Sequence, residues 1–173
     1  MLHVKGFKRV EILIVTVILV ALFTILTSGF SNTLHTQRLN QGIEAVAAAF
    51  TKARGRTLSS GDASGTGQQF GIHIDQSSSP HRIQVFSTNT YAVGLVTDTF
   101  EFPLGVTISA CSFPTGSCPG LVNFAFERLT GNVVNHATTN TIWTSSGTIT
   151  IQSNVLATST TITILPTGSI KTR

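Results

Sequence analysis

The residues best suited to chemistry in this sequence are two cysteines, five histidines and a few isolated acids. Cys111 and Cys118 flank a six-residue turn within the stretch CSFPTGSCPG. Outside the cytoplasm, this spacing predicts a local disulfide, worth roughly 2–3 kcal/mol through loop-closure entropy. The alternative is a pair of free thiols. A zinc site needs two further ligands, and no Cys or His spacing in the sequence supplies them.

Two further patterns could indicate an enzyme or a phosphate site. His73 and Asp75 in GIHID share one face of an expected strand, but Ser and Thr are so abundant that a neighbouring hydroxyl is expected by chance. The sequence has no G-x-S-x-G context for a hydrolase. The Gly/Ser-rich stretch 59–71 lacks a GK[ST] ending and follows a helical pattern, which argues against a phosphate-binding loop. We therefore predict no enzymatic activity, no cofactor and no metal site.

A single acid, Glu11, stands at the start of a long apolar run. Residues 12–37 contain no charged side chain, and residues 12–26 are nearly continuous Ile, Leu, Val, Phe and Ala. A membrane-spanning helix needs roughly 20 mostly apolar residues. An unpaired carboxylate that enters hydrocarbon costs on the order of a few kcal/mol. The position of Glu11 therefore predicts an ion-pair partner for it.

The chain is basic, with a net charge of +4, but its charges are unevenly distributed. Three of the eleven basic residues lie within residues 5–9, where the positive-inside rule puts them in the cytoplasm. Three more (Lys52, Arg54 and Arg56) form a second cluster. Beyond residue 57, four basic residues stand against five acidic ones, so net charge alone is no argument for DNA binding.

The elements that position these residues begin with one long helix. Apolar side chains continue past residue 31 at steps of three and four: Leu39, Ile43, Val46, Phe50, Ala53 and Thr57. No proline occurs before Pro80. We predict a helix from about Phe7 to about Leu58, with residues 7–30 in the membrane and residues 31–58 packed on a domain. Ser28-Gly29 and Gly42 are candidate bends.

Residues 72–173 have the pattern of a β-rich head. Charged residues make up only 10% of the chain, which suits an extracytoplasmic β domain. Hairpin turns are expected at 130–132 (TGN) and 166–168 (PTG). Six short runs alternate with period two: FGIHI, RIQVFS, GVTIS, LVNFAFERL, GTITIQ and TTITIL. We predict six or seven antiparallel strands after the Gly/Ser-rich loop, and hence an α+β fold.

The N-terminal residues resemble a known signal. Lys5-Gly6-Phe7, followed by Glu11 and a long apolar helix, is similar to the class III signal of type IV pilins and type II secretion pseudopilins. In that family a basic leader ends in Gly, and the mature chain begins with Phe and has Glu at its fifth position. The resemblance implies that residues 1–6 are a leader, that a prepilin peptidase cuts between Gly6 and Phe7, and that Phe7 is N-methylated. It also implies that Glu11 pairs with the α-amino group of another subunit in a helical filament.

The match departs from the family pattern in places and extends weakly to the rest of the chain. Lys8-Arg9-Val10 stands where the family has Thr-Leu-Ile, and Ser28 replaces a frequent helix-breaking Pro. Past the helix, an Ala/Arg-rich segment, a Gly-rich loop and strands closing on TITILPTGSIKT are similar to GspH/FimT-like minor pilins and pseudopilins. The resemblance therefore implies a structural, low-copy subunit.

The expected location is the cytoplasmic membrane with the head outside, and a pilus or pseudopilus after assembly. The expected partners are other pilins, the prepilin peptidase and, before assembly, inner-membrane lipid. One alternative is a DNA-binding minor pilin of a competence pilus. In FimT-like pilins a basic C-terminal tail contacts DNA, and here Lys171 and Arg173 alternate at the end of the chain, although the near-neutral charge of the rest of the head favours a solvated, frayed end. A second alternative is a secreted β domain whose signal peptide is removed near Gly29, which Glu11 fits poorly.

Overall fold

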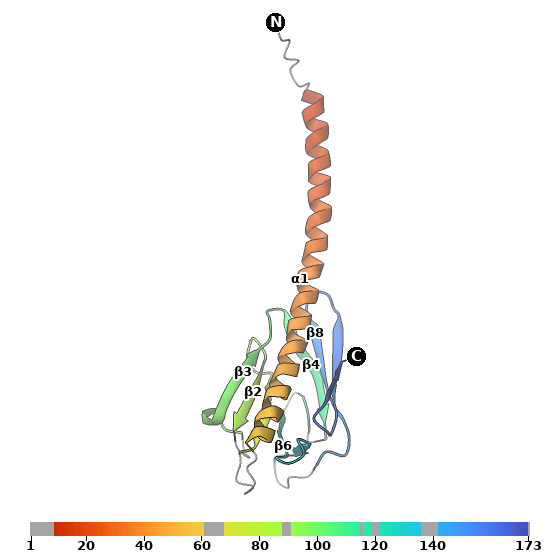
Figure 1. Cartoon of the computed structure of the whole chain (residues 1–173). Coiled ribbons are helices and arrows are strands. Elements are labelled where there is room, and N and C mark those ends of the chain that lie inside the picture. The colour runs from red at the N-terminus through yellow and green to blue at the C-terminus, as the bar shows by residue number, and fades with distance from the viewer. Residues whose placement is uncertain are drawn as a thin grey trace.

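A single long helix leads into two antiparallel sheets, which confirms the predicted α+β architecture (Figure 1). The computed structural model describes residues 9–60, 68–87, 91–114, 116–118, 122–135 and 142–172. The helix, α1, runs from Arg9 to Ser59 without interruption. Its N-terminal half projects beyond the head, and its C-terminal half lies against the sheets (Figure 1).

The helix follows its sequence closely. It is free of proline, and the hydroxyls of five of its threonines donate to carbonyl oxygens one turn earlier, as Thr16 does to Leu13 at 2.8 Å. Neither candidate bend interrupts the helix, because α1 continues through Ser28-Gly29 and through Gly42. At Gly42 the reason for glycine is close packing. A Cβ there would lie 3.0 Å from Val106 and 3.2 Å from Phe102.

The predicted amphipathic face of the helix is confirmed. Five of its six positions are buried and the sixth is partly buried: Leu39, Val46, Phe50, Ala53 and Thr57, with Ile43 at the margin. Thr57 also ties the end of the helix to the first strand, because its Oγ1 accepts a 3.1 Å hydrogen bond from the Phe70 N–H. The second half of α1 is thus part of the head's own core.

The first sheet has the strand order β3-β2-β1-β6-β7. All neighbouring strands are antiparallel, and Ile72 in the central strand faces Val85 on one side and Phe124 on the other. A short 3-10 turn, η1 (Val93–Leu95), precedes β3. The strands are β1 (Phe70–Asp75), β2 (Arg82–Ser87), β3 (Val96–Glu101), β6 (Val122–Phe126) and β7 (Val133–Asn135).

The second sheet has the order β10-β9-β8-β4-β5. Its middle strand alternates buried and half-buried side chains along its whole length, as period-two patterning predicts. The pairing of β4 with β8 shifts register between Ile108 and Ala110. The strands are β4 (Val106–Phe113), β5 (Gly116–Ser117), β8 (Gly147–Ser153), β9 (Ser159–Ile164) and β10 (Ile170–Thr172).

One hydrophobic core joins α1 to both sheets. The fully buried Phe50 ring of the helix lies 5.4 Å from the ring of Phe124 and 6.2 Å from that of Phe126. Trp143 lies 5.0 Å from Phe124 and 5.5 Å from Phe113 of the second sheet. Removing the helix would expose this aromatic cluster to water, so the head depends on the second half of α1.

Both predicted hairpin turns are confirmed, and they touch each other. Gly131, between β6 and β7, and Gly168, between β9 and β10, have φ of +68° and +76°, which glycine adopts without strain. The Val133 N–H donates to the Pro166 carbonyl at 2.8 Å, linking the two sheets at this end of the head. Arg54 of the helix closes the junction by donating to the Gly131 carbonyl at 3.3 Å.

The number of strands differs from the prediction. The six predicted runs correspond to β1, β2, β4, β6, β8 and β9. The described residues form four further strands, β3, β5, β7 and β10, so the expectation of six or seven strands was too low. All four lie at the outer edges of the two sheets.

Candidate membrane and assembly site

The N-terminal half of α1 exposes apolar side chains on all sides. Every large apolar side chain from Val10 to Ile25 is at least 50% exposed, and Phe30 is 67% exposed. The first helix residue buried against the head is Leu39. By length and composition, α1 is a candidate membrane-spanning helix near the N-terminus.

This surface requires an apolar environment. Fully burying an aliphatic or aromatic side chain stabilises it by about 1.5–3 kcal/mol, and α1 exposes more than ten of them along one segment. A helix that is hydrophobic on every side is found inside a membrane or among other helices. By its surface, the segment is thus a candidate for contact with lipid or with neighbouring helices.

Glu11 lies in the first turn of α1 and is exposed. An acid at this position interacts favourably with the positive end of the helix dipole, by about 0.3–1 kcal/mol. Ion pairs among the described residues join Lys52 and Arg56 to Asp98, and Arg82 to Asp75, so none of them involves Glu11. The predicted processing residues, Gly6 and Phe7, and the leader lie outside the described residues.

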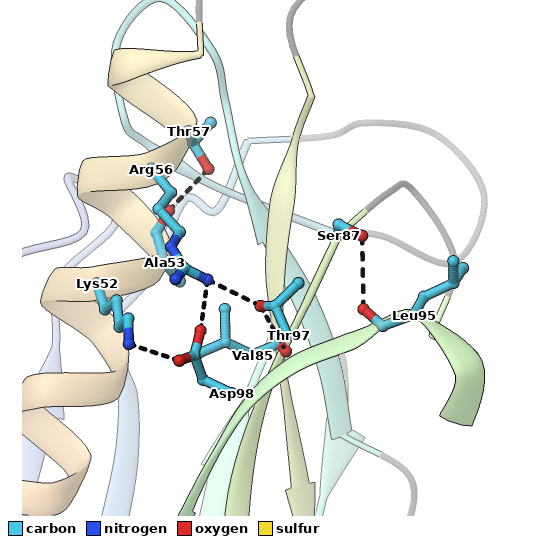
Figure 2. A network of polar contacts seen from close by, with 9 residues as sticks. All are labelled: Lys52, Ala53, Arg56, Thr57, Val85, Ser87, Leu95, Thr97 and Asp98. Atoms are coloured by element: carbon cyan, nitrogen blue, oxygen red, sulfur yellow. Dashed lines mark hydrogen bonds and ion pairs between the residues drawn. The ribbon is translucent and has the colours of Figure 1, made fainter.

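The basic cluster near the end of α1 attaches the helix to the first sheet. Lys52 and Arg56, one turn apart, both pair with the carboxylate of Asp98 on β3 (Figure 2). Arg56 also donates to the hydroxyl of Thr97 at 3.0 Å. Partial burial would raise the pKa of Asp98, but hydrogen bonding by Lys52 and the charge of Arg56 outweigh it and lower the pKa. These cations therefore make contacts within the head.

The predicted disulfide is present. It joins Cys111, buried near the end of β4, to Cys118, which follows β5. The Cys118 N–H also donates to the Cys111 carbonyl at 3.0 Å. The bond thereby closes the β4–β5 hairpin at the edge of the second sheet.

His73 and Asp75 lie on the same face of β1, and each contacts other residues of the head. The buried His73 ring stacks on Tyr91 at a centroid distance of 3.7 Å, and its Nδ1 is 2.6 Å from Oδ1 of Asn123. Burial lowers the pKa of His73, and the hydrogen bond with Asn123 partly offsets this effect. One carboxylate oxygen of Asp75 accepts hydrogen bonds from Ser77, and the other accepts a hydrogen bond from Arg82 at 2.9 Å. His73 and Asp75 thus make the contacts of side chains packed on the surface of a sheet.

Only one of the two C-terminal basic residues belongs to the described part of the chain. Lys171 is exposed on β10, an edge strand, opposite Thr163 of β9. Arg173 lies outside the described residues. Within the described part of the chain, no three His, Cys, Asp or Glu side chains gather as metal ligands would.

Comparison of the chain with family models, with curated protein sequences and with solved structures finds no match.

Sequence reasoning missed Asp98. It lies in the stretch VTDTFE, which forms β3 although its charged and hydroxyl side chains do not suggest a strand. Val96, Asp98 and Phe100 alternate on the face that turns toward the helix, and each is half-buried. An acid at an inward position predicts a cationic partner, because burying an unpaired carboxylate is costly. That signal could have linked Asp98 to the basic cluster on α1.

Proposed function

We propose that this chain is a structural subunit of a helical filament of the type IV pilin or type II secretion pseudopilin kind, anchored in the membrane by α1 before assembly. The observation that carries the proposal is the contrast within one helix. Its first half is apolar on every side and exposed, with a lone acid in the first turn, while its second half is built into the head.

The dimensions of the free half fit both environments. At about 1.5 Å per residue, the apolar stretch from Ile12 to Phe30 extends about 28 Å. This length matches the roughly 30 Å hydrocarbon thickness of a bilayer. In a filament, the same side chains would pack against the helices of neighbouring subunits, so that assembly exchanges lipid contacts for protein contacts.

Glu11 supplies the register of such an assembly. A buried carboxylate needs a paired cation, because desolvation costs several kcal/mol when it is unpaired. Processing before Phe7 would create an α-amino group only four residues from Glu11. Subunits offset along a filament axis would place the amine of one beside the carboxylate of the next.

Processing can be tested at the leader. A side chain at Gly6 would obstruct the close approach of a peptidase to the backbone, so Gly6→Val should leave only the six-residue-longer precursor. N-terminal sequencing of the parent protein should begin at a methylated Phe7. A mature chain that begins near Phe30, or normal processing of Gly6→Val, would contradict the proposal.

Assembly can be tested at Glu11. Glu11→Ala removes a charge from the membrane segment and should leave membrane insertion intact or improve it. It should nevertheless reduce the amount of subunit in sheared filaments by about tenfold or more, because 1.4 kcal/mol corresponds to a factor of ten and losing a buried ion pair costs more than that. The matched control is Glu44→Ala, an exposed acid on the second half of the same helix. Equal incorporation of both variants would show that Glu11 does not set the register.

A further inference from the structure

Two apolar turn residues of the head lie side by side. Leu104, between β3 and β4, is 75% exposed, and Val155, between β8 and β9, is 60% exposed. The first of these turns connects the two sheets, the second lies within the second sheet, and the two turns are hydrogen-bonded to each other. The Asn154 N–H donates to the Gly105 carbonyl at 2.9 Å, and Thr107 Oγ1 is 3.0 Å from Asn154 Oδ1.

These turns lie at the end of the head from which the free half of α1 emerges. The two residues that flank the first turn, Phe102 and Val106, both contact the helix at Gly42. Figure 1 shows the β3–β4 and β8–β9 turns beside the helix at this end, facing the N-terminal half. The turns that carry Leu104 and Val155 therefore lie at the end of the head nearest the candidate membrane span.

The turns are held in fixed conformations. Gly105 has φ of +83° and Ala157 has φ of +51°, and the Val106 N–H donates to the Pro103 carbonyl at 3.0 Å. The second turn is closed by a 2.9 Å hydrogen bond from the Ser153 N–H to the Thr158 carbonyl. The two apolar tips are thus displayed on a defined surface.

The turns of Leu104 and Val155 differ in charge from the turn that holds Leu129, another strongly exposed leucine of the head. Residues 102–107 and 153–158 contain no charged side chain. Leu129, which is 85% exposed, instead follows Glu127 and Arg128 directly and lies in the β6–β7 turn next to Gly131. That turn contacts Arg54 near the C-terminal end of the helix, at the opposite end of the head.

We propose that Leu104 and Val155 form a lipid-contacting tip, with which the head touches the interface of the bilayer while α1 spans it. The proposal rests on the membrane anchoring in the proposed function. Along the axis, Gly42, which the residues flanking the β3–β4 turn contact, is twelve residues, or about 18 Å, beyond Phe30. The headgroup layer of one leaflet accounts for about 5–7 Å of that distance. The two turn residues beyond Phe102 reach back toward the membrane by at most about 7 Å, and a span tilt of about 20° lowers one side of the head further.

Lipid fits this surface better than a protein partner does. A specific protein interface buries roughly 800 Å² on each partner, far more than two aliphatic tips provide. An interfacial contact needs only a few uncharged apolar side chains, because α1 already provides the anchor. The absence of charge in both turns further indicates contact that does not depend on anionic lipid.

The test uses the full chain in phosphatidylcholine vesicles that carry brominated acyl chains, which quench tryptophan fluorescence on contact. Three variants are compared: Leu104→Trp at the tip, Leu129→Trp at the opposite end, and Ile18→Trp in the middle of the span. The native Trp143 is only 3% exposed in the core and gives a common background. Bromines near the top of the acyl chains should quench Leu104→Trp at least about twofold more than Leu129→Trp, since burying apolar surface favours the interface.

The outcomes separate the lipid-contacting tip from the membrane anchoring. Strong quenching of Ile18→Trp with equal, weak quenching at positions 104 and 129 would overturn the lipid-contacting tip and leave membrane anchoring in place. Absence of quenching in Ile18→Trp would overturn both. Adding Val155→Ser to Leu104→Trp should lower the quenching, and adding anionic lipid should change it little. Quenching at position 104 that requires anionic lipid would contradict the contact as proposed.

Discussion

The two halves of α1 share one secondary structure but have opposite surfaces. Both halves are continuous helix, yet large side chains from Val10 to Ile25 are at least half exposed, whereas Val46, Phe50 and Ala53 have no exposed area. The first half is apolar on every side, and the second concentrates apolar residues on one face. The comparison teaches that helix formation is local, while the distribution of side chains around the axis decides what the helix binds.

Gly29 and Gly42 illustrate the same division, whereas Gly55 lies on the exposed side of the second half, where an added Cβ would meet nothing within 4 Å. A Cβ at Gly29 would meet nothing within 4 Å, whereas a Cβ at Gly42 would meet Val106 and Phe102. Both positions are helical, so their local conformation does not distinguish them. Gly42 lies close against residues of the head, and Gly29 lies in the exposed half.

The largest expected effect comes from removing one phenylalanine from each half. Phe50→Ala empties the centre of the aromatic cluster and should lower the free energy of unfolding of the head by about 3–5 kcal/mol. Phe30→Ala, the matched change on the exposed half, should alter it by less than about 0.5 kcal/mol. The measurement is urea unfolding of the full chain in detergent, followed by Trp143 fluorescence. Equal losses of unfolding free energy in the two variants would contradict the division of α1 into an exposed half and a packed half.

A smaller effect is expected from filling the glycines. Gly42→Leu should destabilise the head by about 1–3 kcal/mol, because the added side chain has to displace Val106 and Phe102. Gly29→Leu adds helix propensity and apolar surface in the free half, so it should leave head unfolding unchanged and strengthen membrane retention. Head unfolding in the same assay and membrane fractionation measure the two outcomes. Unchanged stability of Gly42→Leu would mean that the helix does not pack at this position as described.

The smallest effect is expected at the ion pairs that join the second half of α1 to β3. Lys52 and Arg56 are 41% and 37% exposed, so Asp98→Asn should cost only about 0.5–1 kcal/mol at pH 7. The pKa of Asp98 is lowered in the folded state, so the stabilisation is complete above the unfolded value of about 4 and is lost as pH falls below it. The difference between the parent and the variant should therefore shrink as pH falls below about 4 in the unfolding assay. Glu101→Gln, on the same strand, is the control, and a difference that does not shrink with falling pH would show that the charge of Asp98 is not its source.

The sequence identified the interior of each sheet better than its edges. The six runs recognised by their period-two pattern are β1, β2, β4, β6, β8 and β9, which hold the inner positions of both sheets. The four missed strands, β3, β5, β7 and β10, are the edge strands. Three of them, β5, β7 and β10, are only two or three residues long, too short to show a period-two pattern. The fourth, β3, does alternate, but it places an acid, Asp98, at an inward position.

By itself, the sequence determined the long helix, its buried face, the inner strands, two hairpin turns and the disulfide. These features depend on spacing along the chain: steps of three or four, steps of two, a turn glycine, or two cysteines flanking six residues. The tertiary structure alone decided the division into two sheets, the junction of Asp98 with Lys52 and Arg56, and the pairing of the Leu104 and Val155 turns. Those contacts join residues about 40 to 50 positions apart, and their partners are fixed only when the chain closes around the Phe50 core.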